Sequence, residues 1–280
     1  MTVWNKRGYK QNEEDLESAT SPYVADNGKV IKQYSTIDPV RVSRGEIDGY
    51  SFIAKFGHSA AVASGVEEVI WDQADAVYTY ITTASTLYIS SSNTNDDETF
   101  EVQGLDENWA LQTVNVIVSG FTFVPLTGSW MRVFRAKNIS ATTPQGDVYI
   151  SDDNTDGGGD GIPDTATNIK AKVVQGTNQT NMAIYTVPAG KKGYLIDWYI
   201  SMLRGTGVNS TAADCDIFRR TEGGVFRSTQ PIGIQNTGSG IHKYSWPYPL
   251  ELEPKTDIEV RAQPTANAHM GAGFTVLLIN

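Results

Sequence analysis

The sequence predicts an all-β protein: two antiparallel β-sandwich domains, of jelly-roll or immunoglobulin-like type, behind an irregular N-terminal arm. Three observations predict this. Uncharged polar residues and 26 Gly are abundant where helical proteins carry Lys and Glu, and the Thr, Val, Ile and Tyr among the rest suit a pleated surface. Short alternating or β-branched runs recur between turn signals from Ser51 onward. No segment from Ser51 to Asn280 has a convincing amphipathic helical period.

The composition is that of a folded protein. The chain has 280 residues, of which 40% are hydrophobic and 19% charged. A chain of this length can bury a substantial core, as one large β domain or as two domains of ordinary size. A hydrophobic fraction this high with few charges argues against disorder over most of the length.

Residues 1–50 form the predicted arm. Their apolar residues follow no sustained period of 2 or 3.6, and only Asn12 to Ser18 suggests a short helix, with Asn12 as its cap. Trp4 and Tyr9 are the expected anchors of this arm, because a segment without its own core must pack on something else. Its own domain and a neighbouring subunit both remain open as the surface that receives it.

The first sandwich is predicted over residues 51–151, and its clearest feature is a hairpin. Residues 99–104 and 111–118 read as strands, joined through 105–110. Leu111, Val114, Val116 and Val118 mostly hold period two, so we expect them on the buried face. Trp109 lies in the connecting turn, so we expect it to be exposed or to contact a neighbour, as interface hot spots favour such residues.

Further strands are predicted along both halves of the body. Trp71, Trp130 and Trp198 lie inside such runs, where alternation places them in the core. The predicted strands are residues 68–71, 86–91, 130–136, 147–151, 170–175, 183–187, 193–203, 214–219, 225–229, 241–246, 257–261 and 273–279.

The stretch 152–168 is the predicted junction between the two sandwiches, and residues 169–280 form the second one. It is rich in Asp, Gly and Thr, and polar turn formers do not build a core. The split leaves two halves of about the size of a sandwich domain.

The junction also has part of the residue pattern of a calcium-binding loop. Alternate oxygen-bearing side chains followed by Gly can point several carboxylates at one hard cation. The candidate ligands are Asp152, Asn154, Asp156, Asp160 and Asp164, and the tail from Asp160 to Asp164 resembles the calcium-wrapping repeats of thrombospondin-like proteins. However, Pro163 stands where an EF-hand counted from Asp152 needs Glu. The alternative is an Asp/Gly turn with at most weak ion binding.

Charge and hydropathy exclude two classes of partner. The formal net charge is −10, and no Lys/Arg cluster interleaves with aromatic residues, so we expect no nucleic-acid binding. No apolar stretch approaches the roughly 20 residues that cross a bilayer, and the first residues lack the apolar block of a signal peptide. We therefore expect no membrane insertion.

No signature of catalysis is present. His58, His242 and His269 sit far apart in unrelated contexts, and no zinc-protease, nucleophile-elbow or phosphate-loop pattern occurs. Cys215, the single cysteine, lies between two Asp residues, and nearby carboxylates raise a thiol pKa. We expect a small buried residue there, not a nucleophile. The sequence therefore predicts a protein that is not an enzyme and needs no cofactor, calcium aside.

Several segments together resemble virion structural proteins of tailed bacteriophages, particularly those that infect aquatic bacteria. Each segment is ordinary strand-and-turn sequence, and the combination carries the resemblance, which covers most of the chain after residue 50. The segments are 55–57, 68–72, 102–106, 182–190, 194–198, 246–250 and 256–262.

This resemblance implies a component of a virus particle and no catalytic residues. We expect a capsid-associated protein of the decoration, cement or head-appendage kind, located in the virion, oligomeric, and bound to capsid or neck proteins. A tail or neck adaptor or fibre-attachment protein is the alternative within this class. A carbohydrate-binding module that recognises the host is the alternative from another class.

Overall fold

The computed structural model describes residues 38–73, 78–203, 212–235 and 239–280, together with the backbone of four short strands nearer the N-terminus. Its contacts divide the chain into two units, residues 1–48 and 49–280. This division lies close to the predicted end of the arm at residue 50. The fold of the larger unit is all-β, as predicted.

The first unit contains two pairs of short strands and a short helix. Strand β1 (Val3–Trp4) pairs with β2 (Lys10–Gln11), and β3 (Tyr23–Val24) pairs with β4 (Val30–Ile31). Helix α2 (Pro39–Ser43) begins where the Asp38 carboxylate accepts a hydrogen bond from the Val40 amide at 2.9 Å. Pro39 suits the first helical position, where its missing N–H costs nothing. The helix predicted from Asn12 to Ser18 lies outside the described residues.

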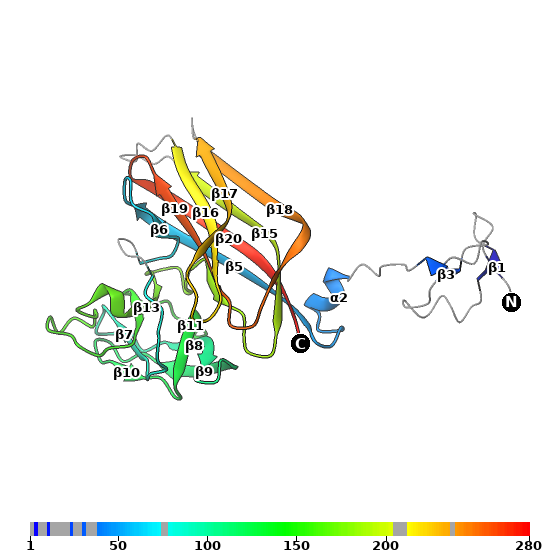
Figure 1. Ribbon diagram of the computed structural model, residues 1–280. Helices are drawn as coiled ribbons and strands as arrows, with labels where there is room; N and C mark the ends of the chain where they lie inside the picture. The colour runs from blue at the N-terminus through cyan, green and yellow to red at the C-terminus, as the bar shows by residue number, and fades with distance from the viewer. Residues whose placement is uncertain are drawn as a thin grey trace. The chain divides into compact units, whose positions relative to one another are not determined.

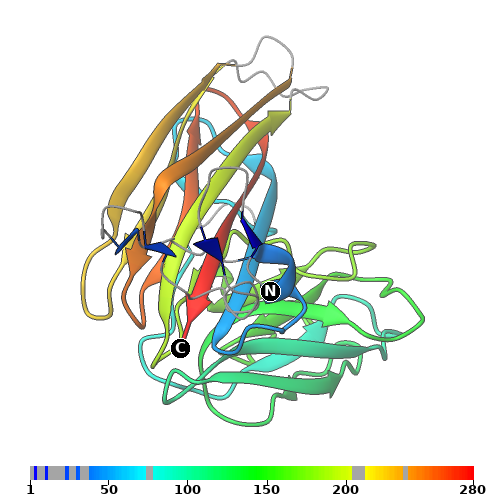
Figure 2. The ribbon, with the colours of Figure 1, turned by 90° about the vertical axis from the view of Figure 1, so that its right-hand side faces the viewer.

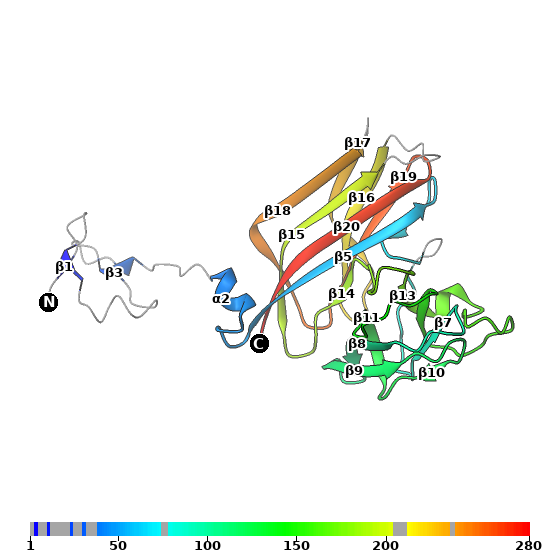
Figure 3. The same ribbon diagram turned by 180° about the vertical axis from the view of Figure 1, so that it is seen from behind.

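The second unit contains a sandwich of two sheets (Figures 1 and 3). Sheet A has the strand order β18-β15-β20-β5, and sheet B has the order β14-β19-β16-β17, with β6 also on β19. The strands of sheet A are β5 (Tyr50–Val62), β15 (Lys192–Leu203), β18 (Ser239–Leu252) and β20 (Ala268–Ile279). Those of sheet B are β6 (Glu68–Val69), β14 (Ile184–Thr186), β16 (Ala212–Arg220), β17 (Arg227–Gln235) and β19 (Asp257–Pro264).

The order of these strands is that of a jelly roll. Strands β6 and β14 lie end to end along β19, through the pairs Val69 with Arg261 and Ile184 with Glu259, so they act as one strand. Counted in chain order, the sandwich then has eight strands, with sheet A in the order 6-3-8-1 and sheet B in the order 2-7-4-5. This alternation of strands between two facing sheets is the double Greek key of a jelly roll.

A second β domain is inserted into the interrupted strand. The chain leaves the sandwich after Trp71, which bridges Met182 where it returns. Between them lie sheet C, in the order β11-β8-β9, and sheet D, in the order β10-β7-β12-β13. Their strands are β7 (Tyr88–Ser91), β8 (Thr99–Asp106), β9 (Leu111–Ile117), β10 (Val124–Pro125), β11 (Trp130–Asn138), β12 (Val148–Ser151) and β13 (Ile169–Val173).

Each domain has its own hydrophobic core. Trp198 and Phe274 lie in the core of the jelly roll, while Trp71 and Trp130 lie in that of the inserted domain. All three tryptophans predicted to be internal are at most 1% exposed. Figure 2 shows the two sheets of the jelly roll above the smaller sheets of the inserted domain.

The predicted domain boundaries differ from this arrangement. Strand β5 pairs with β20 along its length, from Tyr50 with Ile279 to Val62 with Ala268, so the predicted first half contributes an edge strand to the jelly roll. Residues 152–168 are no boundary, because they connect β12 to β13, two paired strands of sheet D. Composition located a loop correctly, but only pairing between distant segments shows which strands share a sheet.

The predicted strands are present at the predicted places. The hairpin is β8 with β9, and its register pairs Thr99 with Ile117 and Leu105 with Leu111. One detail of its alternation was wrong: Leu111 is 50% exposed, while Val114 and Val116 pack against the core. The edge strand β5, the two-residue β10 and the short pairs β1–β2 and β3–β4 of the predicted irregular arm were not predicted.

Candidate interaction surface

Sheet A has one face on the core and one face directed away from it. On β15, Trp198, Ile200 and Met202 belong to the core. Because side chains alternate along a strand, Tyr199, Ser201 and Leu203 lie on the opposite face, which we call the outer face. In this sheet Tyr199 pairs with Lys243 of β18 on one side and with Gly273 of β20 on the other. Gly273 in turn pairs with Phe56 of β5.

Gly273 leaves bare backbone in the middle of this row. A Cβ at this position would lie 2.5 Å from Cε1 of Tyr199 and 2.4 Å from the Lys55 carbonyl oxygen. Glycine therefore allows the tyrosine ring to lie against the β20 backbone, in the way that glycine in a strand permits close approach. Phe56, on the neighbouring strand, stays 39% exposed.

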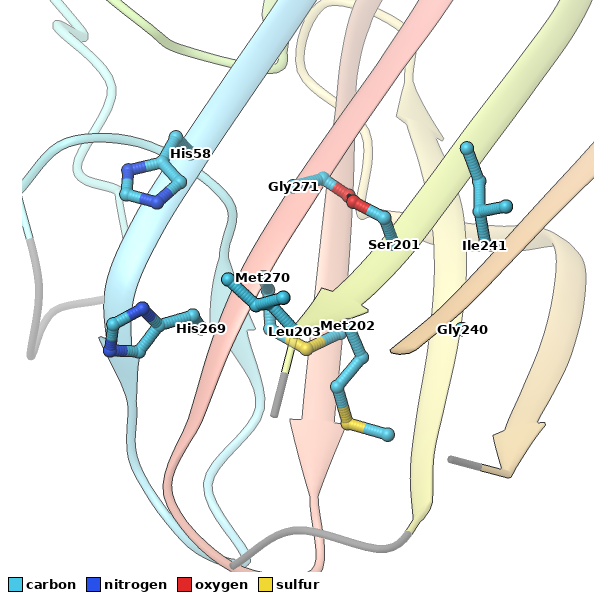
Figure 4. A pocket seen from close by; sticks show the side chains of 9 residues that line it. All are labelled: His58, Ser201, Met202, Leu203, Gly240, Ile241, His269, Met270 and Gly271. Carbon is cyan, nitrogen blue, oxygen red and sulfur yellow. Dashed lines mark hydrogen bonds between the residues drawn. The ribbon is translucent and has the colours of Figure 1, made fainter. Parts of the chain in front are cut away.

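The neighbouring row of residues, two positions further along the strands, forms one side of a cavity of about 380 Å³. Here His58, Gly271, Ser201 and Ile241 stand side by side on four strands. Figure 4 shows the imidazoles of His58 and His269 on the β5 side and Ile241 beyond β15. Ile241 is 74% exposed and Leu203 is 53% exposed. The cavity is thus walled mainly by apolar side chains and glycine backbone.

The polar groups of this cavity are not arranged for nucleophilic catalysis. The Ser201 hydroxyl donates to the Gly271 carbonyl oxygen at 3.2 Å instead of to an imidazole. The rings of His58 and His269 meet edge to face with centroids 6.5 Å apart. Nδ1 of His58 lies 3.8 Å from the Asp72 carboxylate, whose other oxygen accepts two hydrogen bonds from Asn181. A base that activates a hydroxyl needs hydrogen-bond contact with it.

The free edge of β18 adds a second exposed feature. The register between β15 and β18 shifts between Leu195 and Asp197, which pair with Leu250 and Ser245. The residues between them, Trp246 to Pro249, therefore bulge from the ladder, and Tyr248 is 87% exposed. Proline cannot donate a ladder hydrogen bond, so Pro247 and Pro249 keep this edge from pairing with another strand. At this edge the Tyr248 side chain, and not a row of unpaired backbone groups, is exposed to solvent.

Trp109, predicted to be exposed or to meet a neighbour, is buried at 6% exposure. Its positive φ of 62° turns the hairpin, and the Arg132 guanidinium lies 4.6 Å from its ring. The Lys255 ammonium lies 5.3 Å from the ring. The turn packs on the jelly roll, where the Ala189 amide donates to the Trp109 carbonyl oxygen at 2.9 Å. Sequence position alone could not reveal this packing. The side chains of Trp4 and Tyr9 lie outside the described residues.

The carboxylates of the proposed calcium loop have other partners. Asp156 accepts from the amides of Gly159 and Gly161 at 2.7 and 2.8 Å, and these amides lower its pKa. Asp164 accepts from the Gly157 amide. Asp152 lies 3.1 Å from the buried Lys170 ammonium, and Asp160 accepts from the Ile162 amide. Asn154 is exposed. Over the described residues, no three His, Cys, Asp or Glu side chains gather to hold a metal.

Cys215 is buried on β16, as predicted. Burial, then Asp214 and Asp216, raise the pKa of its thiol to about 12. A thiol nucleophile requires a depressed pKa.

A buried ionic cluster joins the inserted domain to the jelly roll, and sequence patterns did not reveal it. Asp257 on β19 binds Arg132 of β11 and Arg220 of β16. Next to it, Glu259 accepts from the Tyr80 hydroxyl at 2.7 Å and pairs with Arg261. A cavity of about 380 Å³ adjoins Arg132 and Arg220, but both guanidiniums are already paired with Asp257. No local signal in the sequence identifies side chains that meet only through the domain interface.

None of the helices in the described part of the chain has the length and apolar character of a membrane span. The chain matches no protein-family model, and no curated protein matches it in sequence.

Solved virus structures align with much of the chain at very low similarity. A chain of the Cowpea mosaic virus empty virus-like particle is 10% identical, over 72% of this chain and 81% of that one, with a TM-score of 0.23. A chain of infectious bursal disease virus, Gx strain, is 8% identical, over 82% and 72%, with a TM-score of 0.23. The STIV MCP is 11% identical, over 80% and 96%, with a TM-score of 0.22. TM-scores this low establish no common fold, so the jelly roll rests on strand order alone.

Proposed function

We propose that this protein is a non-enzymatic structural subunit of a tailed-phage virion, associated with the capsid as a decoration, cement or head-appendage protein. One observation carries the proposal: over the described residues, the outer face of sheet A exposes apolar side chains beside bare glycine backbone, and its Ser201 hydroxyl donates to a backbone carbonyl instead of to an imidazole. Exposed apolar surface of this kind is typical of protein contacts. The resemblance of the segments after residue 50 to phage virion proteins supplies the kind of partner.

The jelly roll is compatible with this role but does not by itself select it. Jelly rolls occur in viral capsid proteins and also in lectins, and a fold does not determine a function. We propose other virion proteins of the capsid or neck, and further copies of this chain, as the partners. Each copy would contact them through the outer face around Phe56, Tyr199 and Ile241 and through Tyr248.

The direct test is image reconstruction of particles that carry this chain, with its copy number measured on the same particles. Density on the capsid lattice, with a copy number that follows the lattice, supports the capsid-associated role. Density confined to the tail axis, with a copy number that follows the tail symmetry, would instead support the tail or neck adaptor. Absence of the chain from purified particles would refute both.

A matched pair of variants tests the contact surface. Ile241→Glu places a charge on the outer face, while Val225→Glu places one on a turn of the opposite sheet; the original side chains are 74% and 70% exposed. Both variants should keep the stability of the wild type, because neither site is buried. We expect only Ile241→Glu to reduce incorporation into particles. Equal incorporation of the two variants would exclude this part of the outer face as the contact.

The carbohydrate-binding alternative rests on the exposed aromatic rings. Tyr248 is 87% exposed, and an aromatic face can stack on a sugar ring. Glycan-array binding that is lost in Tyr248→Ala, with the fold unchanged, would support this function. Trp109 is not a suitable target for that test, because its burial makes any substitution a change to the fold.

A further inference from the structure

Lys55 lies in an unusual setting for a lysine. It belongs to the edge strand β5, and its ammonium donates to the carbonyl oxygen of Phe134 on β11. The same nitrogen lies 5.8 Å from the centre of the Phe134 ring. The side chain therefore points into the space between the jelly roll and the inserted domain.

Lys55 lines a cavity of about 190 Å³. Its walls come from β5, β8, β11, β14 and the segment before β14. They include Phe134 and Tyr185, the edge-strand residues Phe52 and Phe56, and the polar residues Gln103 and Thr180. Among the described residues that form the wall, Arg135 and Tyr185 are the only titratable groups besides Lys55. No carboxylate among them neutralises the amine, and the one charged neighbour, Arg135, has the same sign.

Tyr185 supplies a second, independent feature. Its ring packs on Phe134 with centroids 4.9 Å apart, and the residue is 1% exposed. Its hydroxyl has no hydrogen-bond partner within the described structure. Burial raises the pKa of this hydroxyl above its ordinary value, so it stays protonated and able to donate. A buried donor without an acceptor is costly, and Tyr185 lines the same cavity as Lys55.

We propose that this cavity is a binding site for small apolar aldehydes, which the Lys55 amine captures as an imine. Lysines that are desolvated in an apolar pocket, or placed beside another cation, form such adducts with carbonyl compounds. Lys55 is half-buried, lies beside the Phe134 ring and has Arg135 as a neighbouring cation. The aromatic wall suits the hydrocarbon part of the aldehyde, and the Tyr185 hydroxyl is the donor for its oxygen.

The chemistry needs no other reactant. The Nζ lone pair attacks the carbonyl carbon, and the C=O π pair moves to oxygen, which accepts a hydrogen bond from Tyr185. Transfer of a proton from nitrogen to oxygen gives the carbinolamine. The C–O bond then breaks, the oxygen leaves as water with a second proton from nitrogen, and the C=N bond forms. Aldehyde and amine thus give imine and water, with no oxidation or reduction.

Burial, and secondarily Arg135, lower the pKa of Lys55 to about 7. At pH 7 about half of such amines are neutral, against roughly one in 3,000 for a lysine with the ordinary value. A less basic amine is also a weaker nucleophile, so the gain in rate is smaller than the gain in neutral amine.

The experiment traps the imine in the full chain. Protein is incubated with propanal and cyanoborohydride at pH 7, and propylated lysines are quantified by peptide mass spectrometry. We expect at least about tenfold more modification at Lys55 than at Lys243, which is exposed and paired with Asp197. Urea should remove the difference, because the unfolded chain has no cavity. Equal modification of Lys55 and Lys243 in the folded protein would overturn the proposal.

Two variants refine the test. Lys55→Met should remove this adduct and leave the modification of Lys243 unchanged. Tyr185→Phe keeps the ring and its packing but removes the donor, and we expect it to lower modification of Lys55 several-fold. Unfolding curves of both variants verify that they fold. Unchanged modification of Lys55 in folded Tyr185→Phe would show that the Tyr185 hydroxyl takes no part in capture of the aldehyde, which would overturn its assigned role.

Discussion

Arg132 and Asp257 form a two-pronged ion pair across the boundary between the inserted domain and the jelly roll. Nε of Arg132 donates to one carboxylate oxygen at 2.9 Å, and Nη2 donates to the other at 3.0 Å. Both side chains are nearly inaccessible, at 6% and 1% exposure. Arg220 and the Thr186 hydroxyl complete the shell around the same carboxylate. Asp257 thus holds strands from both domains together.

Removal of this carboxylate should strongly destabilise the protein. Asp257→Ala leaves two guanidiniums without their partner, and the loss of one member of a buried pair costs about 3–5 kcal/mol. Lys192→Ala, which removes an exposed pair with Glu251, should lower the free energy of unfolding far less, because solvent screens that pair. Urea unfolding of both variants measures the difference. Similar losses would mean that the Asp257 cluster contributes no more than a surface pair.

Gly273 should not tolerate a side chain. Gly273→Ala would place Cβ 2.4 Å from the Lys55 carbonyl oxygen, and relief of such overlap costs about 1–3 kcal/mol. Gly233→Ala is the control, because the nearest atom to its added Cβ would be 4.0 Å away. Thermal unfolding of the two variants makes the comparison. A wild-type melting temperature for Gly273→Ala would show that the sheet relaxes around the contact.

The free energy of unfolding of the wild type should depend on pH in part through the titration of Lys55. Its pKa is about 7 in the folded protein against an ordinary value of 10.5, so between these values the unfolded chain binds more protons. Stability from this residue therefore rises with pH over that window, by up to about 1.4 kcal/mol per pH unit. Below pH 7 both states hold the proton and this slope disappears.

Lys55→Met isolates this contribution. The difference in unfolding free energy between wild type and variant should change from pH 7 to 10 in favour of the wild type, because other groups titrate equally in both proteins. A difference that stays constant over this range would mean that Lys55 keeps an ordinary pKa in the folded protein.

Calcium should have little effect on the loop 152–164. Backbone amides and Lys170 already occupy the carboxylates of Asp152, Asp156 and Asp164, so the loop has internal partners that hold its shape. We expect equal melting temperatures and equal proteolysis of this loop in calcium and in chelator. A higher melting temperature with calcium, or protection of the loop, would support the calcium site that the sequence suggested.

Local sequence pattern was sufficient for most of the strands. Alternation and β-branched composition located the β8–β9 hairpin and most other strands of the larger unit, because the period of two is a property of neighbouring residues. It failed at β5, where Lys55 and Gly57 interrupt the apolar pattern. Both make sense only in three dimensions: a Cβ on Gly57 would lie 2.2 Å from the Ile70 carbonyl oxygen.

The candidate surface was less predictable than the strands. Trp109 seemed exposed because it lies in a turn, yet the turn packs between the domains and Arg132 lies against its ring. Tyr248 was part of a recognised segment, but its exposure depends on a register shift between β15 and β18. Exposure depends on what packs over a residue, and residues distant in the chain decide that.

The sequence by itself determined the all-β class, the positions of most strands, the burial of Trp71, Trp130 and Trp198, and the unreactive setting of Cys215. These follow from composition and short-range alternation. Only the tertiary structure decided that β5 closes sheet A beside β20, that one strand of the jelly roll is split by a whole domain, and that Asp257 and Lys55 lie where the two domains meet. The physical reason is that strand pairing and buried charge depend on partners far away in the chain, which no local pattern encodes.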